Sequence, residues 1–276
     1  MPTRSAIVKI FLPLAASLLW AAPIVAQTTH VSLPLKAQQL MGMKVEDIDG
    51  QKIGTIRNLV LDTRTGQLKY AVIGSGGFLG VRATLRLAPA EVMSAATAKR
   101  QTLAINATAA QWSHAPVFKW SHLASLAEPT RAREISRYFE PTAARASRAG
   151  TLSTTGRWAA EETNALEPVL KFVSDLIGMN VVNQNQEKIG EVLDLLVSFG
   201  KPRPAFALVS TGRLFHRGHQ FAVPLKALSA SDNGRALKIE VDTAALQQAS
   251  PFNSQVWDAR GTNGSGQVYR YSKGDE

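Results

Sequence analysis

The chain has 276 residues, of which 45% are apolar, and a formal net charge of +10. This length can supply the cores of two ordinary domains, and the excess of lysine and arginine favours an anionic partner. The chain has no cysteine, which excludes disulfides, thiol nucleophiles, cysteine-ligated metals and a lipid anchor on cysteine.

The first 26 residues have the features of a secretory signal peptide. Arg4 and Lys9 form a short basic region, an almost wholly apolar stretch occupies 10–25, and Ala26 offers a small residue at the cleavage point. The apolar stretch is shorter than the roughly 20 residues of a membrane-spanning helix and contains two prolines. We therefore expect a periplasmic or secreted protein with no transmembrane segment after cleavage; an uncleaved anchor is the alternative. Export makes nucleic acid a poor partner.

The rest of the chain contains an internal repeat. LMGMKVEDIDGQKIGTIRNLVLD at 40–62 aligns without a gap with LIGMNVVNQNQEKIGEVLDLLVS at 176–198, at an offset of 136 residues. Two copies of one domain explain this match. The glycines that we expect to serve backbone geometry recur in both copies: Gly42 and Gly54 in the first, Gly178 and Gly190 in the second.

Within each copy the pattern is that of short strands and tight turns. Asp49-Gly50 predicts a two-residue hairpin turn, and Asn185-Gln186 holds the same place in the second copy. Pro89 and Pro224 each predict the start of a short helical turn. Residues 237–241 alternate between apolar and polar, as in a strand with one buried face. Several short strands in about 80 residues predict a small closed or nearly closed barrel.

The stretch at 40–62, with LKYAVIGSGGFLGVRATLRLAPAEVM after it, resembles the PRC-barrel domain. This family is named after the H subunit of the photosynthetic reaction centre and is shared with a ribosome maturation factor. The second copy has lost the Asp-Gly turn and most of the glycine loop. The resemblance implies a small, largely β barrel that usually serves as a binding or assembly module without catalytic residues. We expect a mainly all-β protein with two such barrels in tandem, each with short helical segments, joined by a flexible, partly helical linker.

Each copy ends in an aromatic coda, and an arginine-rich region lies between the copies. Residues 131–157 hold six arginines against two glutamates, and we expect an exposed linker that is helical around 131–139. The codas are expected to lie on the outside of their own barrels with the polar tips of Trp120, Tyr138, Trp257 and Tyr271 in solvent; a shelf for sugars is the alternative. The expected order is signal peptide 1–26, spacer 27–35, first barrel with coda 36–138, linker 139–170, second barrel with coda 171–271, and tail 272–276.

The glycine cluster GSGGFLG at 74–80 does not predict a phosphate site. A phosphate loop needs a helix directly after its glycines, whereas a strand-like segment follows Gly80. The loops of both copies instead carry apolar pairs, which either close the end of their own barrel or form a docking patch. The candidate binding residues are Phe78 and Leu79 in the first copy and Arg213, Leu214, Phe215 and Arg217 in the second.

No constellation in the sequence predicts catalysis, a cofactor or a metal. His216 and His219 would need His114 or His122 as a distant ligand to close a zinc shell, and a solvated basic loop is the simpler interpretation. Asp47 and its acidic neighbours are interpreted as solvated carboxylates at a strand edge.

The functional hypothesis is a non-catalytic, exported scaffold protein that binds a protein or an anionic envelope component. A periplasmic small-molecule or metal-binding protein is the alternative, and a hydrolase is a distant third.

Overall fold

The computed structural model of this chain describes residues 35–76, 83–96, 102–140, 168–200, 203–211, 219–231, 234–239 and 252. Strands dominate these residues and the helices are short, which confirms the predicted mainly β fold. Among the helices of these ranges, none combines the length and apolar character needed to cross a membrane.

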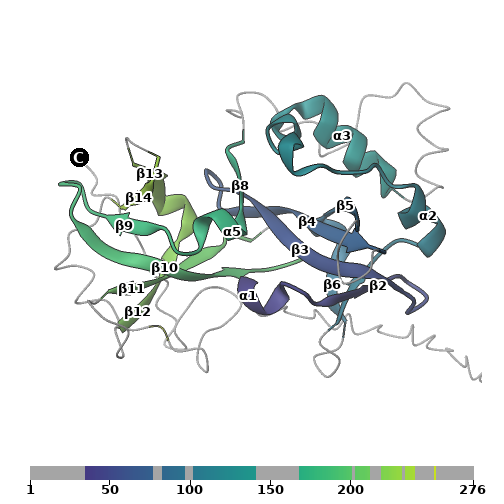
Figure 1. Ribbon diagram of the computed structural model, residues 1–276, viewed down its shortest axis with the longest axis horizontal. Helices are drawn as coiled ribbons and strands as arrows, with labels where there is room; N and C mark the ends of the chain where they lie inside the picture. The colour runs from purple at the N-terminus through teal and green to yellow at the C-terminus, as the bar shows by residue number, and fades with distance from the viewer. Residues whose placement is uncertain are drawn as a thin grey trace, which may run out of the picture. The chain divides into compact units, whose positions relative to one another are not determined.

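The first sheet contains seven strands (Figure 1). Its order is β5-β4-β3-β2-β7-β6, and β8 pairs with β3 outside this path. Neighbouring strands are antiparallel, except for the parallel pair β2 and β7. The strands are β2 (Lys44–Glu46), β3 (Lys52–Asp62), β4 (Gln67–Ser75), β5 (Thr84–Pro89), β6 (Met93–Ala96), β7 (Thr102–Ile105) and β8 (Leu170–Phe172).

The second sheet repeats this topology strand for strand. Its order is β12-β11-β10-β9-β14-β13, with β1 pairing with β10 outside the path and with β9 and β14 parallel. The repeat in the sequence therefore corresponds to a repeated structural domain, which confirms the prediction of two barrels in tandem. The strands are β1 (Leu35–Lys36), β9 (Asn180–Val182), β10 (Lys188–Val197), β11 (Phe206–Thr211), β12 (His219–Pro224), β13 (Leu228–Ala230) and β14 (Ala236–Ile239).

Short helical segments connect and cover the strands. The turns after Pro89 and Pro224 form as predicted, and the helix expected around 131–139 is α3. The helical segments are α1 (Ala37–Leu40), η1 (Ala90–Val92), α2 (Ala109–His114), η2 (Trp120–His122), η3 (Ala124–Ala127), α3 (Pro129–Tyr138), α5 (Val173–Leu176) and η4 (Leu225–Ala227).

A hairpin turn forms after β2 and after β9, but its loop has three residues and not the predicted two, because the N–H of Asp47 donates to Gln51 O and that of Asn183 to Glu187 O. Gly50 has φ +77°, which glycine adopts without steric cost. The second repeat has the left-handed residue at the equivalent position, but it is Gln186, with φ +62°, and not the neighbouring Asn185. Loss of the glycine therefore leaves the turn type unchanged and moves the conformational strain onto a glutamine.

The two repeats exchange their first strands. β1 begins the first repeat but pairs with β10 of the second, and β8 begins the second repeat but pairs with β3 of the first. The paired residues are Leu35 with Val197 and Lys36 with Leu196 in one sheet, and Lys171 with Leu61 and Phe172 with Val60 in the other. Each pair in one sheet has a counterpart in the other sheet whose residues are 136 positions away, so the exchange is reciprocal.

A side chain at a β-bulge fixes each exchanged segment. The register of β3 shifts between Ile56 and Asn58, and that of β10 shifts between Val192 and Asp194. Asn58 Oδ1 accepts the N–H of Ser174 at 3.3 Å, and Asp194 Oδ1 accepts the N–H of Gln38 at 3.1 Å. In Figure 1, α1 accordingly lies beside β10, and α5 lies beside β3.

Buried side chains of both repeats belong to one hydrophobic core cluster. It extends from Ala37 and Leu40 in the first repeat to Leu237 and Ile239 in the second. The barrels are therefore one folded unit within the described residues, a coupling that the sequence analysis does not predict. The predicted linker lies outside the described residues from 141 to 167.

Candidate binding sites

The glycines that recur in both repeats have the same geometry in each. Gly42 and Gly178 have φ +80° and +85°, in the left-handed region. Gly54 and Gly190 lie close to a neighbouring strand: a Cβ on Gly54 would lie 2.7 Å from Gly74 O, and one on Gly190 would lie 2.5 Å from Ser210 O. The glycines thus allow a turn and a close strand contact in each barrel.

The base of the first candidate loop is held by a hydrogen-bond chain. Ser75 ends β4, donates its hydroxyl to Ile53 O at 2.6 Å and accepts Trp112 Nε1–H at 2.9 Å. Trp112 is only 3% exposed and was missed by the sequence analysis, although the Thr108–Gln111 capping box just before it is a signal for α2. Phe78 and Leu79 lie outside the described residues.

The second candidate loop is carried by the β11–β12 hairpin. The last described pair of this hairpin is Thr211 with His219. Arg213, Leu214, Phe215, His216 and Arg217 all lie outside the described residues. The structure therefore positions the ends of the strands that carry both loops and leaves the docking and barrel-closing interpretations as predictions.

The two hairpins extend in opposite directions. Gln67, at the start of β4, forms an antiparallel bridge with Pro204, just before β11. Because the two chain segments run antiparallel there, β4 and β11 leave the bridge in opposite directions. At about 3.3 Å per residue, Ser75 lies about 26 Å along one strand and Thr211 about 23 Å along the other, up to about 50 Å apart.

Asp47 is a structural side chain. It is 3% exposed, and its Oδ1 accepts the N–H groups of Asp49 at 3.0 Å and Gln51 at 2.7 Å. Its Oδ2 accepts the N–H of Ala109 at 2.9 Å, at the start of α2. The interpretation of Asp47 as a solvated carboxylate is therefore wrong, because three backbone donors satisfy it inside the fold. Asn183 holds the equivalent turn in the second repeat.

The histidines of the described residues do not gather into a metal site. His114 Nδ1 lies 2.8 Å from Ala110 O, and His122 is exposed on η2. In the part of the chain that the structure describes, no group of three or more metal-ligating side chains converges. His216 lies outside this part, and for His219 only the backbone is described.

One phenylalanine of each aromatic coda is hydrogen-bonded to an outer strand of a sheet. The N–H of Phe118 donates to Leu85 O of β5 at 2.8 Å, and that of Phe252 donates to Gln220 O of β12 at 2.6 Å. Tyr138 does not keep its polar tip in solvent as predicted, because its hydroxyl donates to Gln111 O at 2.5 Å. Trp257 and Tyr271 lie outside the described residues.

Trp120 contacts the exchanged strand of the second repeat. Its ring centroid lies 5.2 Å from that of Phe172 and 6.0 Å from that of Phe118, both at edge-to-face angles. Trp120 is nonetheless 45% exposed. The first coda thus packs partly on the other repeat and presents an indole to solvent.

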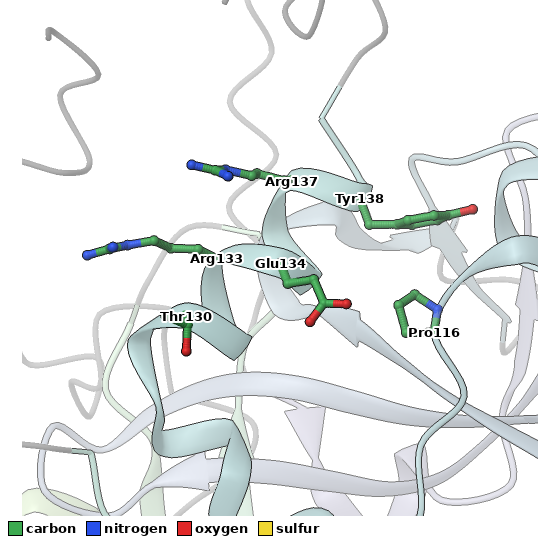
Figure 2. Close-up of a pocket in the computed structure, with 6 residues that line it drawn as sticks. All are labelled: Pro116, Thr130, Arg133, Glu134, Arg137 and Tyr138. Atoms are coloured by element: carbon green, nitrogen blue, oxygen red, sulfur yellow. The ribbon is translucent and has the colours of Figure 1, made fainter.

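An open pocket of about 560 Å³ lies along α3. Pro116, Glu134 and Tyr138 are on one flank of the helix, whereas Arg133 and Arg137 extend side by side on the other (Figure 2). Thr130 completes the lining. The Glu134 carboxylate forms an ion pair with Arg131 at 2.6 Å, so its charge is compensated locally.

Tyr70 is a buried titratable group in β4. It is 7% exposed and pairs with Val60 and Pro89. Burial raises the pKa of Tyr70 to about 12, and the negative charge of Glu91 on η1 adds to the effect. Phe206 occupies the equivalent position in the second repeat, which indicates that the hydroxyl is not needed for the barrel.

Comparison with known proteins supports the family that the residues indicate. The family model of the PRC-barrel domain matches residues 35–111 and 168–246, more than half of the chain. Curated proteins give no match to the chain. Each matched region contains the strands of one sheet, apart from the exchanged strands β1 and β8, and the chain therefore belongs to the PRC-barrel domain family, with two copies of the domain.

Proposed function

We propose that this chain is an exported, non-catalytic scaffold protein that joins two partner molecules through loops at its opposite ends. Phe78 and Leu79 dock at one end, and Leu214 and Phe215 dock at the other, with Arg213 and Arg217 adding positive charge. The apolar N-terminal stretch supports export, and the family supports a binding role without chemistry.

One observation carries this proposal: the antiparallel bridge between Gln67 and Pro204. It directs the described strands of the two hairpins away from each other, and this supports a separate partner for each loop. A single compact partner would span up to about 50 Å to reach both. Two partner molecules, or two sites of a larger assembly, match this geometry better.

The strand exchange adds a mechanical reason. A flexible tandem gains avidity only through the effective concentration that its linker allows. Here the β1–β10 and β8–β3 pairings fix one repeat on the other. A scaffold with fixed ends sets the spacing of its partners and does not merely hold them nearby.

The test is crosslinking in cells followed by mass determination of the captured complexes. Wild-type chain is expected to give complexes with partners at both ends. Phe78→Ala and Phe215→Ala should each leave complexes with one partner, because each removes the apolar anchor of one loop. The double variant should give none. N-terminal sequencing of the recovered protein tests cleavage after Ala26.

Ile48→Ala is the matched control, because Ile48 is 57% exposed in the hairpin turn after β2 and belongs to neither loop. Thermal unfolding of each variant separates docking from barrel closure. If Phe78→Ala and Phe215→Ala unfold at clearly lower temperature, the pairs close their barrels. If the folded double variant captures partners as well as wild type does, the proposed docking sites are wrong.

A further inference from the structure

Two exposed cations and a threonine lie together on the outer face of the first sheet. Lys44 on β2 pairs with Thr55 on β3, and Thr55 pairs with Gly74 on β4. Val45, the next residue on β2, is fully buried, so this row of three residues faces away from the barrel core. Arg57, two residues after Thr55, is exposed, as is Lys44. We call Lys44, Thr55 and Arg57 the Arg57 surface.

Gly74 makes room for the side chain of Arg57. A Cβ on Gly74 would lie 2.7 Å from Arg57 Nε and 3.0 Å from its Cγ. The arginine therefore lies across the backbone of β4, and any other residue at position 74 would push it aside. Gly74 does not have a positive φ, so space for Arg57, and not a turn, explains the glycine.

The second repeat forms the same strands without these cations. At the offset of 136 residues, Arg57 and Gly74 are replaced by Leu193 and Ser210, and Asn180 stands in place of the lysine. A residue with a Cβ thus occurs where no arginine needs the space. Because the barrel forms with either set, the fold does not require the combination of Arg57 and Gly74.

The charge of the Arg57 surface is not compensated by the sheet. Lys44 and Arg57 make no hydrogen bond or ion pair within the described residues. Glu46 is the acidic residue on this face of β2, and it stands opposite Lys52 on β3. The charges of Lys44 and Arg57 therefore remain free to attract a partner.

The spacing of the two cations indicates the kind of partner. Lys44 and the Arg57 side chain over Gly74 flank Thr55 on the two neighbouring strands, so they are about 10 Å apart at about 4.8 Å per strand. Two carboxylates three residues apart on an extended chain have the same separation, at about 3.3 Å per residue. A single small oxyanion does not span this distance.

We infer that the Arg57 surface binds an extended acidic segment of a protein partner through two carboxylates three positions apart. Arg57 binds one carboxylate through its guanidinium fork, and Lys44 attracts the other as a point charge. The inference deepens the proposed function, on which it rests, by giving the chemistry of the partner at the first loop: Gly74 begins the segment that carries Phe78 and Leu79.

The experiment measures binding of two labelled peptides to the full chain by fluorescence anisotropy. Both contain two glutamates among glycines and serines, three positions apart in one peptide and adjacent in the other. Wild-type chain is expected to bind the spaced peptide about threefold more tightly, and binding should weaken at high salt. Arg57→Gln and Lys44→Gln should each lower affinity for the spaced peptide about threefold, as for exposed ion pairs.

Gly74→Ala tests the positioning of Arg57. The added Cβ displaces the arginine, so this variant should lose as much affinity as Arg57→Gln and lose no more when the two changes are combined. Arg57→Leu with Gly74→Ser copies the second repeat. It should unfold within a few degrees of wild type and bind both peptides equally.

Lys226→Gln is the matched control, because it removes an exposed cation from η4 of the second repeat. It should leave affinity for the spaced peptide within about 1.5-fold of wild type. Phe78→Ala should also leave it unchanged, so peptide binding and partner capture in cells can fail independently.

Three results would overturn the inference. The first is equal binding of both peptides by wild-type chain, and the second is a Lys226→Gln loss as large as that of Arg57→Gln. The third is displacement of the spaced peptide by inorganic phosphate but not by sodium chloride of equal ionic strength, which would identify a site for a single oxyanion.

Discussion

Gly54 and Gly190 are the residues at which close strand contact is most directly testable. Gly54→Ala places a Cβ 2.7 Å from Gly74 O, a rigid backbone atom. We expect a loss of about 3 kcal/mol in the free energy of unfolding, measured by urea denaturation. Gly190→Ala should behave in the same way, because its Cβ would meet Ser210 O at 2.5 Å.

Gly42→Ala is the control for these variants. No atom lies within 4 Å of its added Cβ, so only the strain of φ +80° remains, at about 1 kcal/mol. Equal losses for Gly42→Ala and Gly54→Ala would show that the strands can separate at no cost and that the close contact is unimportant.

Tyr70 makes stability depend on alkaline pH. Its pKa is raised from 10.0 in the unfolded chain to about 12 in the folded one, so the folded state binds the phenol proton more tightly. The stabilisation is complete below pH 10 and is lost as pH rises from 10 towards 12. Tyr70→Phe should remove this loss, on the order of 2 kcal/mol, in urea unfolding at pH 9 and pH 11.5.

Lysines also titrate in this range, so the informative quantity is the difference between wild type and Tyr70→Phe. Phe206 in the equivalent position indicates that the barrel accepts phenylalanine. A constant difference between the two proteins from pH 9 to pH 11.5 would mean that the Tyr70 hydroxyl is in contact with solvent.

At the scale of elements, the sequence predicted the turns and the helix that depend on residues close together in the chain. The Asp49-Gly50 turn, the turns after Pro89 and Pro224, and helix α3 all follow from residues within a few positions of one another. The duplicated topology was equally predictable, because repeated sequence places the same turns at the same spacing.

The exchange of β1 and β8 could not be predicted in this way. Strands of two or three residues carry no signal for their partner. β2 pairs only with the beginning of β3, which leaves the edge at 60–62 for β8, and the sequence does not reveal this free edge.

Asp47 was misread for a related reason, because its three backbone donors come from its own turn and from a helix that starts at Ala109. The sequence predicts six binding residues, and all six lie outside the described residues, so their role stays a prediction.

Substitution of Phe172 tests how much the exchanged strand β8 contributes to the stability of the fold. It is 9% exposed, pairs with Val60 and contacts the rings of Phe118 and Trp120. Phe172→Ala should cost about 3 to 4 kcal/mol in the free energy of unfolding and alter Trp120 fluorescence. Lys171→Ala, an exposed neighbour on β8, should stay within about 0.5 kcal/mol of wild type. Similar losses for both would argue that β8 is only loosely attached.

At the scale of the whole molecule, the reciprocal exchange explains why two PRC-barrel domains act as one body. Each repeat supplies a strand and a helical turn that the other repeat binds, through Asn58 in one case and Asp194 in the other. The arrangement resembles the interface of a two-fold symmetric dimer, but both halves belong to one chain, because each contact in one repeat has its counterpart 136 residues away. The reciprocal exchange thus fixes one PRC-barrel domain on the other.

The most direct test of this account is to cut the chain between its repeats. A single protease site inserted between residues 140 and 168 of the full chain lies outside every described strand and helix. After cleavage, the two fragments should remain together at the size of the intact protein in gel filtration and native mass spectrometry, because paired strands and a shared core hold them. Separation into two folded fragments of about half the mass would contradict the strand exchange and the single two-ended scaffold built on it.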